Sequence, residues 1–121
     1  MSDTESHLRK FQKELSSGLA ALMLLAVLAR RGEPMYGYQI AKQLEGRGEG
    51  ALAGKQSALY PVLRNMHGSG LLDSHVEPSV SGPPRRYYQI TPMGREVLRS
   101  WTEEWLNTRD FVESIVTGDR A

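Results

Sequence analysis

Apolar residues recur at intervals of three or four positions near the start of the chain, which is the spacing of one face of an amphipathic helix. The members of this stripe are Leu8, Phe11, Leu15, Leu22 and Leu25. From residue 19 to residue 28 nearly every position is apolar, so we expect this half of the helix to lie in the core. Gly32 and Pro34 stop the pattern. A long helix is therefore predicted over about residues 5–31.

Two shorter helices are predicted after Pro34. The first covers about residues 36–46, and its apolar face is made of Tyr38, Ile40, Ala41 and Leu44. A glycine-spaced loop follows. The second helix covers about residues 55–68, and its buried face is made of Leu59, Val62, Leu63 and Met66. Pro61 is compatible with this helix because we expect it in or near the first turn.

The segment 71–91 has the pattern of a β-hairpin. LLDSHVE alternates in polarity as a half-buried strand does, and RRYYQIT returns with Tyr88 and Ile90 on one side. Between them SGPP supplies a turn, because glycine permits a reversal and proline fixes φ. We expect the tip of this hairpin to project the positive charge of Arg85 and Arg86.

Thr91 and Pro92 are the residue types of a helix N-cap and first position, and a helical pattern then continues to about Thr117. The order of long helix, two short helices, hairpin and long helix predicts an α+β protein, mainly α. Residues 1–91 are predicted to form a winged helix-turn-helix with the hairpin as its wing, and residues 92–121 a C-terminal dimerisation helix.

An apolar stripe runs along the last predicted helix. A small single domain has little other apolar surface that could cover this stripe. A second copy of the chain would cover it, and aromatic residues are common at such interfaces. The residues predicted in the dimer interface are Phe11, Leu15, Leu98, Trp101, Trp105, Thr108, Val112 and Ile115. The alternative is that Trp101 and Trp105 only complete the core of one chain.

The composition argues against several classes of function, among them thiolate chemistry and metal binding. Of 121 residues, 40% are hydrophobic and 24% are charged, as in an ordinary globular domain, and the net charge is only +1. The absence of cysteine excludes disulfides and thiolate chemistry, and the three histidines lack a ligand-like spacing. We therefore expect no enzyme activity, metal or cofactor. The apolar run 18–29 is too short to span a bilayer, so a cytoplasmic protein without a membrane partner is expected.

The local distribution of charge favours double-stranded DNA as a partner. In a helix-turn-helix the second helix of the motif lies in the major groove, and its N-terminal residues contact the base edges. In this chain these residues are Lys55, Gln56 and Ser57. Lysine suits guanine and glutamine suits adenine. Tyr60 and Arg64 share a helix face and are candidates for contacts with flanking phosphates. The alternatives are a helix start that is merely polar and a Tyr60 ring that packs in the core.

The wing and the second helix add three further candidates. Arg85 and Arg86 alternate along a strand, so we expect one of them to face the duplex while the other lies along the sheet. The negative potential of the minor groove attracts an arginine side chain. The alternative is that Arg85 and Arg86 are a solvated surface pair, which is the more common situation for adjacent arginines. Tyr36 lies at the start of the second helix and is a candidate phosphate contact, because helix N-termini attract anions.

Three motifs in this order resemble the PadR family of bacterial transcriptional regulators over roughly residues 15–110. They are PMYGYQI, SALYPVLRNMHGSGLL and GPPRRYYQITPMG. The resemblance implies a compact member with a single final helix. In such members a tryptophan at the position of Trp105 faces a channel at the dimer centre where flat ligands stack, which makes Trp105 and the neighbouring Trp101 candidate effector contacts.

Two departures from the family pattern are visible. The family often has Gly-Thr before Leu-Tyr-Pro, whereas this chain has Ser57 and Ala58, so the usual threonine hydroxyl is missing. The family often has a charged pair before the glycine that ends the third helix, whereas this chain has His67, Gly68 and Ser69. We expect a weaker helix end there.

These patterns together predict a homodimeric, ligand-responsive repressor of the PadR type that binds a pseudo-palindromic operator. Each protomer would place its third helix in a major groove and its wing along the adjacent minor groove, with half-sites about 34–36 Å apart or a multiple of that spacing. The effector would be a small planar aromatic or hydrophobic compound. The alternative is a winged-helix module that binds proteins and never DNA, which the near-neutral net charge leaves open.

Overall fold

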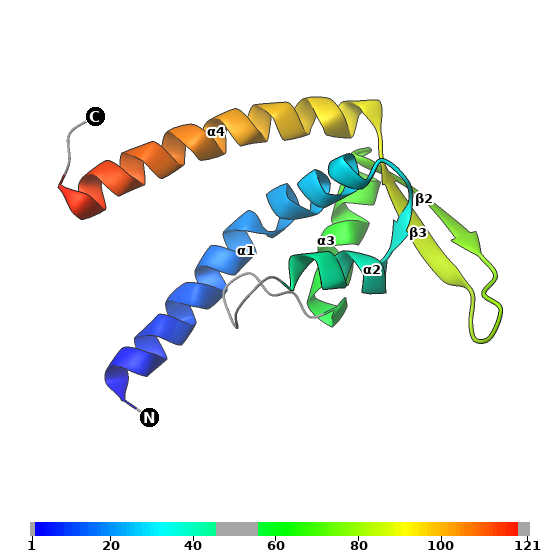
Figure 1. Ribbon diagram of the computed structural model, residues 1–121, viewed down its shortest axis with the longest axis horizontal. Helices are drawn as coiled ribbons and strands as arrows, with labels where there is room; N and C mark the ends of the chain where they lie inside the picture. The colour runs from blue at the N-terminus through cyan, green and yellow to red at the C-terminus, as the bar shows by residue number, and fades with distance from the viewer. Residues whose placement is uncertain (1, 46–55, 119–121) are drawn as a thin grey trace.

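The computed structural model describes residues 2–45 and 56–118, which form four helices around a small three-stranded sheet (Figure 1). In chain order the elements are α1 (Asp3–Arg31), β1 (Met35–Tyr36), α2 (Gly37–Leu44), α3 (Gln56–Gly68), β2 (Leu72–Glu77), β3 (Arg85–Ile90) and α4 (Pro92–Thr117). Helices α2 and α3 followed by the β2–β3 hairpin make a winged helix-turn-helix. The predicted fold class is confirmed.

Helix α1 begins at Asp3, somewhat earlier than expected, because Ser2 caps it. The Ser2 hydroxyl accepts a hydrogen bond from the Glu5 amide, and the Glu5 carboxylate accepts one from the Ser2 amide, each at 3.1 Å. This reciprocal capping box satisfies two amide groups that have no partner inside the helix. At the other end Gly32 adopts a left-handed φ of 74°, and its amide donates to the Leu28 carbonyl oxygen.

The core lies between α1, α2, α3 and the inner face of the sheet. Its buried members are Leu24, Leu25, Leu28, Met35, Ile40, Leu44, Leu59, Leu63, Met66, Leu71, Leu72, Tyr88 and Ile90. By length and composition alone α1 is apolar enough to cross a membrane, which the short run 18–29 did not suggest. A core helix passes the same test, and the buried leucines of α1 are part of this core.

The sheet contains one strand that the hydrophobic pattern does not reveal. Strand β1 is only two residues long, and it pairs antiparallel with β3, Met35 opposite Tyr88 and Tyr36 opposite Tyr87. Strand β3 pairs on its other side with β2, where Leu72 lies opposite Ile90. The strand order β1-β3-β2 therefore makes β3 the central strand, with alternate side chains on the inner and outer faces.

The wing tip is formed by the loop between β2 and β3. The Ser79 hydroxyl lies 2.9 Å from the carbonyl oxygens of both Gly82 and Pro83, which closes the turn. Strand pairing extends as far as Arg85, so the reversal is complete before the arginines are reached. Arg85 and Arg86 are the first residues of β3, as the predicted returning strand RRYYQIT has them, so their charge lies directly behind the tip and not at its apex.

A tight junction joins the wing to α4. The Thr91 hydroxyl donates to the Gly70 carbonyl oxygen at 2.8 Å and accepts from the Gly94 amide at 2.9 Å, so Thr91 is the N-cap that the sequence predicts. A Cβ added at Gly94 would lie 2.3 Å from the Leu71 carbonyl oxygen and 2.7 Å from Cγ1 of Ile90. This close packing fixes the direction in which α4 leaves the sheet.

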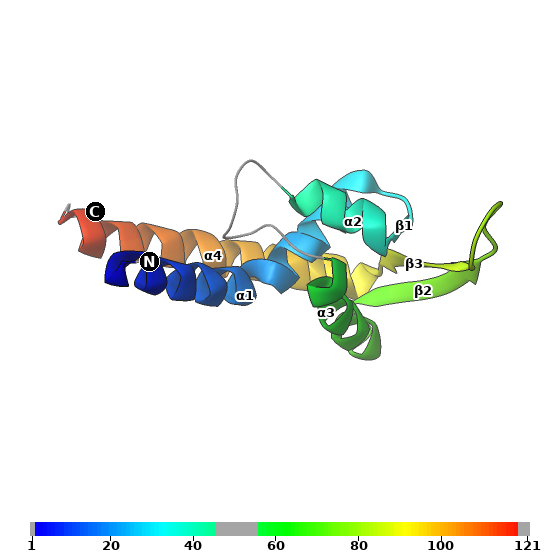
Figure 2. The ribbon, with the colours of Figure 1, turned by 90° about the horizontal axis from the view of Figure 1, so that it is seen from below.

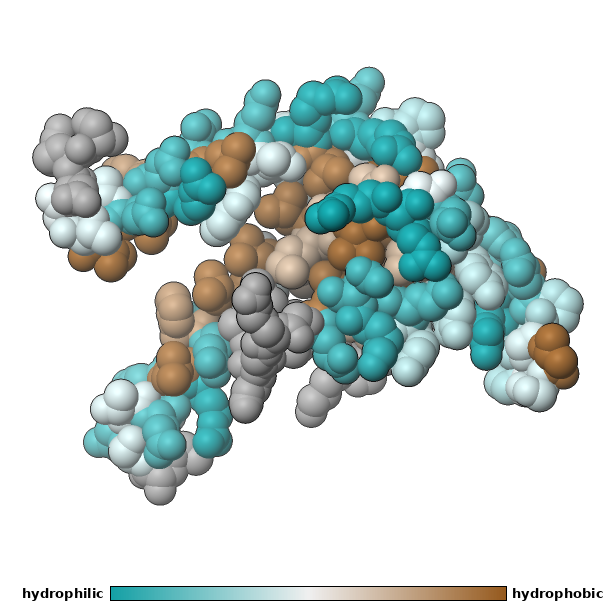
Figure 3. Space-filling model, in the orientation of Figure 1, coloured by the Kyte–Doolittle hydropathy of each residue, from teal (hydrophilic) through white to brown (hydrophobic). Residues whose placement is uncertain are grey.

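Beyond the core, α1 and α4 continue as two arms that diverge toward the termini (Figure 1). Both arms extend away from the β2–β3 hairpin (Figure 2). Apolar residues gather on the sides of the arms that face the space between them (Figure 3). We call the exposed large apolar side chains of the two arms the arm surface; they are Leu8, Phe11, Leu15, Leu106, Phe111, Val112, Ile115 and Val116. The N-terminal half of the α1 stripe is therefore exposed, while the C-terminal half is buried.

Candidate nucleic-acid interface

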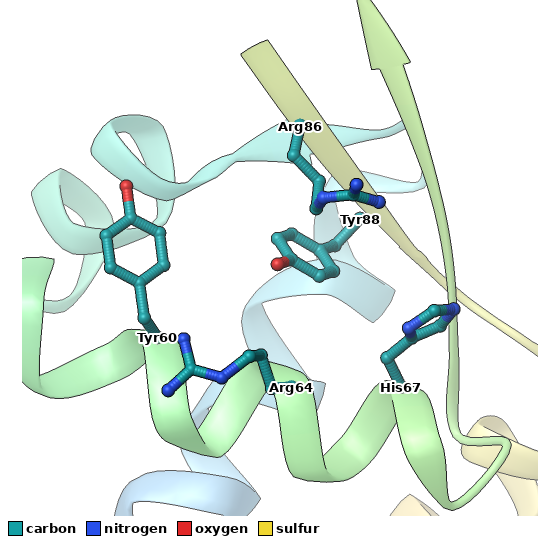
Figure 4. A pocket seen from close by; sticks show the side chains of 5 residues that line it. All are labelled: Tyr60, Arg64, His67, Arg86 and Tyr88. Carbon is teal, nitrogen blue, oxygen red and sulfur yellow. The ribbon is translucent and has the colours of Figure 1, made fainter.

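A cleft of about 500 Å³ lies between α3 and β3 (Figure 4). It is lined by Tyr60, Arg64 and His67 from α3 and by Arg86 and Tyr88 from β3. In Figure 4 the Tyr88 ring stands between the two elements with its hydroxyl directed into the gap, while Arg86 and His67 lie toward β2. Three of these five side chains are basic and two carry hydroxyl groups. Such a lining suits an anion.

The spacing of residues in α3 explains why this helix contributes three of the lining side chains. Residues three and four positions apart share a helix face, so Tyr60, Arg64 and His67 align on the exposed side. The opposite side, which includes Leu63, is buried. Pro61 lies in the second turn of α3, close to the first turn, and its ring is exposed.

Alternation along β3 separates the two wing arginines. Arg86 lies on the same face as Tyr88, toward α3, and its Nη1 donates a hydrogen bond to the Ser74 hydroxyl at 2.8 Å. Arg85 lies on the opposite face, where its guanidinium carbon is 4.5 Å from the centre of the Tyr36 ring. The expected alternation is present, and Arg86 is the arginine that faces the cleft. Which of the two contacts DNA remains a prediction.

Tyr36 belongs to an aromatic row on the outer face of the sheet. Its ring centre lies 5.4 Å from that of Tyr87 and 6.4 Å from that of Tyr38. The Tyr36 amide donates to Oε1 of Gln39 at 3.1 Å, which ties the residue to the first turn of α2. Tyr38, predicted on the apolar face of this helix, is instead half exposed and stacks on Tyr36.

The Tyr60 ring packs beside the start of α2. A Cβ added at Gly37 would come within 3.0 Å of both the ring and the hydroxyl oxygen of Tyr60. Glycine at this position therefore leaves room for the tyrosine, which is packed on one side and exposed on the other. The Tyr60 ring is therefore not part of the buried core, and its contact with a phosphate stays a prediction.

The residues predicted to read base edges lie at the limit of the described chain. Lys55 is outside the described residues, and Gln56 and Ser57 form the first turn of α3. Their contacts with DNA stay a prediction that rests on the position of this turn beside the cleft.

The cleft lining carries positive charge without a carboxylate among its described residues. None of the ion pairs within residues 2–45 and 56–118 includes Arg64 or Arg86; these pairs are Lys42–Glu45, His75–Glu77 and Arg109–Asp110. Within the same ranges, no group of three or more histidine or acidic side chains is arranged to hold a metal ion. The cleft is therefore a place where an anion would meet uncompensated cations.

The residues predicted in the dimer interface divide into three groups. Leu98 and Trp101 pack against the core of their own chain, which supports the alternative reading for Trp101. Trp105 is partly buried one turn later, outside that cluster. The remaining members are exposed along the arms; they are Phe11, Leu15, Thr108, Val112 and Ile115.

Two cleft residues, His67 and Tyr88, are not singled out as site residues by the sequence motifs. His67 follows Arg64 by three positions on a helix, and Tyr88 follows Arg86 by two positions on a strand. These spacings place each of them on the same face as a predicted phosphate contact. The spacing from Arg64 and Arg86 is therefore the sequence feature by which His67 and Tyr88 could have been identified as site residues.

A basic cleft between the second helix of a helix-turn-helix and its wing defines a class of proteins, the winged-helix transcriptional regulators. Within this class the chain belongs to the transcriptional regulator PadR-like family, whose family model matches residues 24–100. Membership implies DNA binding and a regulatory role rather than a catalytic one. The resemblance inferred from the three motifs is confirmed.

Solved structures of the same family are similar over most of the chain. A PadR family transcriptional regulator from Eggerthella lenta is 33% identical, with a TM-score of 0.70 over 85% of this chain and 86% of that one. A PadR-like transcriptional regulator from Bacillus cereus is 25% identical, with a TM-score of 0.70 over 86% of this chain and 97% of that one. An uncharacterised protein from Lysinibacillus sphaericus is 24% identical over 83 residues, which is 69% of this chain and 76% of that protein.

Proposed function

We propose that this protein is a cytoplasmic, ligand-responsive repressor that binds a pseudo-palindromic operator as a homodimer. The observation that carries the proposal is the cleft between α3 and the wing, which is basic, open and free of carboxylates in its described lining. The phosphate backbone supplies much of the affinity of DNA-binding proteins, and it binds best to cations that are not already paired with a carboxylate.

The proposed DNA contacts fall into two groups. Gln56 and Ser57, at the start of α3, and Lys55, which precedes them in the sequence and lies outside the described residues, read base edges in the major groove. The second group holds the backbone and sets the register without reading sequence; its members are Tyr36, Tyr60, Arg64 and Arg86. Arg85, which lies over the Tyr36 ring, supports the wing from its outer face and adds long-range charge.

The arm surface supports the homodimer. Helices of 29 and 26 residues leave the core with apolar sides exposed, and such a large apolar surface is unusual on a monomer. A second copy brings the same surface, so a two-fold interface buries both at once. Two-fold symmetry then presents two α3 helices to successive major grooves.

Substituting both Val112 and Ile115 with aspartate is expected to convert the dimer into a monomer. Both side chains are exposed on α4, so the folded chain tolerates the change, whereas a carboxylate buried in an interface is costly. Sedimentation equilibrium measures the outcome. The matched control is Val80→Asp at the exposed wing tip, which we expect to stay dimeric. A double variant with the same mass in solution as the unmodified protein would contradict the proposed interface.

The effector is proposed to be a small planar aromatic compound that stacks on Trp105 between the arms. Trp105 is partly buried and follows Trp101, which packs against the core, by one helical turn, so a ligand there would bias the angle between the arms. The ligand lowers DNA affinity only if it binds one arrangement of the two DNA-binding heads better than another.

Selection of bound sequences from random duplex DNA tests the function. Enrichment of inverted half-sites, with centres about one helical turn or a multiple of it apart, is the expected result. Repeating the selection with a panel of planar aromatic compounds is expected to reduce recovery for at least one of them. Failure to retain any duplex would favour a protein-binding winged-helix module instead.

A further inference from the structure

His67 occupies a position in the cleft that two arginines already make basic. It lies one turn after Arg64 on α3, and in Figure 4 its imidazole points toward β2 beside Arg86. The side chain is exposed, so an anion that enters the cleft can reach it. Histidine differs from both arginines because its charge changes between about pH 5 and pH 8.

The elements packed around His67 present cations and hydroxyl groups to it. From α3 and β3 these are the side chains that line the cleft with it, Tyr60, Arg64, Arg86 and Tyr88. From β2 the neutral Ser74 lies on the cleft side, where its hydroxyl accepts the Arg86 hydrogen bond.

The charged residues of the neighbouring elements face elsewhere. Alternation along β2 places Asp73 and Glu77 on the outer face of the sheet, where Glu77 pairs with His75 at 2.8 Å. On α2, Lys42 pairs with Glu45 at 3.6 Å on the exposed side. No carboxylate among the described residues lines the cleft to compensate a protonated His67.

We propose that the cleft between α3 and β3 is a binding site for one phosphate of the DNA backbone, and that His67 is its third cationic ligand, charged only when protonated. The inference rests on the proposed DNA binding and adds a ligand and a pH dependence to it. Arg64 and Arg86 bind the phosphate from opposite sides at any physiological pH, and the Tyr88 hydroxyl donates from between them.

The direction of the pH effect follows from the charges. An anion held between the two arginines favours the protonated imidazole, so binding of the anion is coupled to uptake of a proton by His67. Affinity for DNA therefore rises as the pH falls from about 8 to about 6, and we expect a change of about tenfold at constant ionic strength.

Three proteins test this pH dependence with a random-sequence duplex as the probe: the unmodified protein, His67→Gln and His75→Gln. Glutamine keeps the polar character of histidine but cannot gain a proton. The expected result is that His67→Gln binds with nearly the same affinity at both pH values, while His75→Gln keeps the full pH effect. A His67→Gln protein that retains the full pH effect would overturn the inference.

Inorganic phosphate is the second probe, and it separates the site from its proposed DNA partner. At about pH 6, phosphate is expected to perturb the imidazole NMR signals of His67 but not those of His75. If phosphate does so while no duplex binds at any pH, the anion site stands and the proposed function fails. If duplex binds but neither probe involves His67, the function stands and the inference fails.

Discussion

Replacing Arg64 and Arg86 together with alanine is expected to lower the affinity for duplex DNA by about a hundredfold or more. Both guanidinium groups are exposed and line the same cleft, so a backbone phosphate placed there meets both. A hydrogen bond to a charged group contributes about 1.5–3 kcal/mol, and each 1.4 kcal/mol is tenfold in affinity. Fluorescence anisotropy with a labelled duplex measures the loss, and circular dichroism checks that the fold is kept.

The matched control for this double variant replaces Arg95 and Arg99 with alanine. Both side chains are exposed on α4, which lies across α1 from α3 in Figure 1. Each double variant removes two positive charges from every protomer, so the control measures the non-specific effect of net charge. We expect the affinity of this control variant for duplex DNA to fall severalfold at most. Equal losses in the two double variants would show that the cleft has no special role.

Gly94→Ala is expected to lower the free energy of unfolding by about 3 kcal/mol or more. The added methyl group would meet the Leu71 carbonyl oxygen at 2.3 Å, and backbone cannot move aside as a flexible side chain can. Because the Thr91 hydroxyl ties the same junction to Gly70, relief requires α4 to shift relative to the wing. Thermal unfolding at a fixed protein concentration is expected to show a midpoint lower by about 10 °C or more.

Gly68→Ala provides the control for the glycine substitution. Gly68 is the last residue of α3, and a Cβ there would have nothing within 4 Å. Its unfolding free energy is expected to change by less than about 1 kcal/mol, in the stabilising direction if the residue stays helical. If the midpoint temperature of thermal unfolding of Gly94→Ala equals that of the unmodified protein, the junction between the wing and α4 does not fix the position of α4.

The helices and the wing could be predicted because local chemistry determines their ends. Thr91 and Pro92 begin α4 as expected, since the threonine hydroxyl accepts from the Gly94 amide. Gly32 ends α1 in a left-handed conformation that glycine adopts freely. Tyr88 and Ile90 are buried on one face of β3, which their alternation indicated.

Features that depend on distant partners could not be predicted in this way. Strand β1 exists because Met35 and Tyr36 pair with β3, and two residues are too few to show an alternation. The length of the wing loop depends on how far the β2–β3 pairing extends, and the last pair is Glu77 opposite Arg85. No local sequence pattern indicates either of these two features.

The candidate site was predictable one element at a time. The four-residue spacing of Tyr60 and Arg64 placed them on one helix face, and strand alternation separated Arg85 from Arg86. The sequence did not show that Arg64 and Arg86 line one cleft, because that requires the packing of α3 against the sheet. His67 gains its proposed role only from this packing.

The dependence of duplex affinity on salt concentration most directly tests whether the paired clefts of a dimer hold the DNA backbone. Each of two protomers would hold one phosphate between Arg64 and Arg86, so the two clefts neutralise at least two phosphates. The logarithm of the association constant is then expected to fall against the logarithm of salt concentration with a slope of about −1.8 or steeper. A slope near zero, or no detectable binding at low salt, would contradict a DNA-binding role for these clefts.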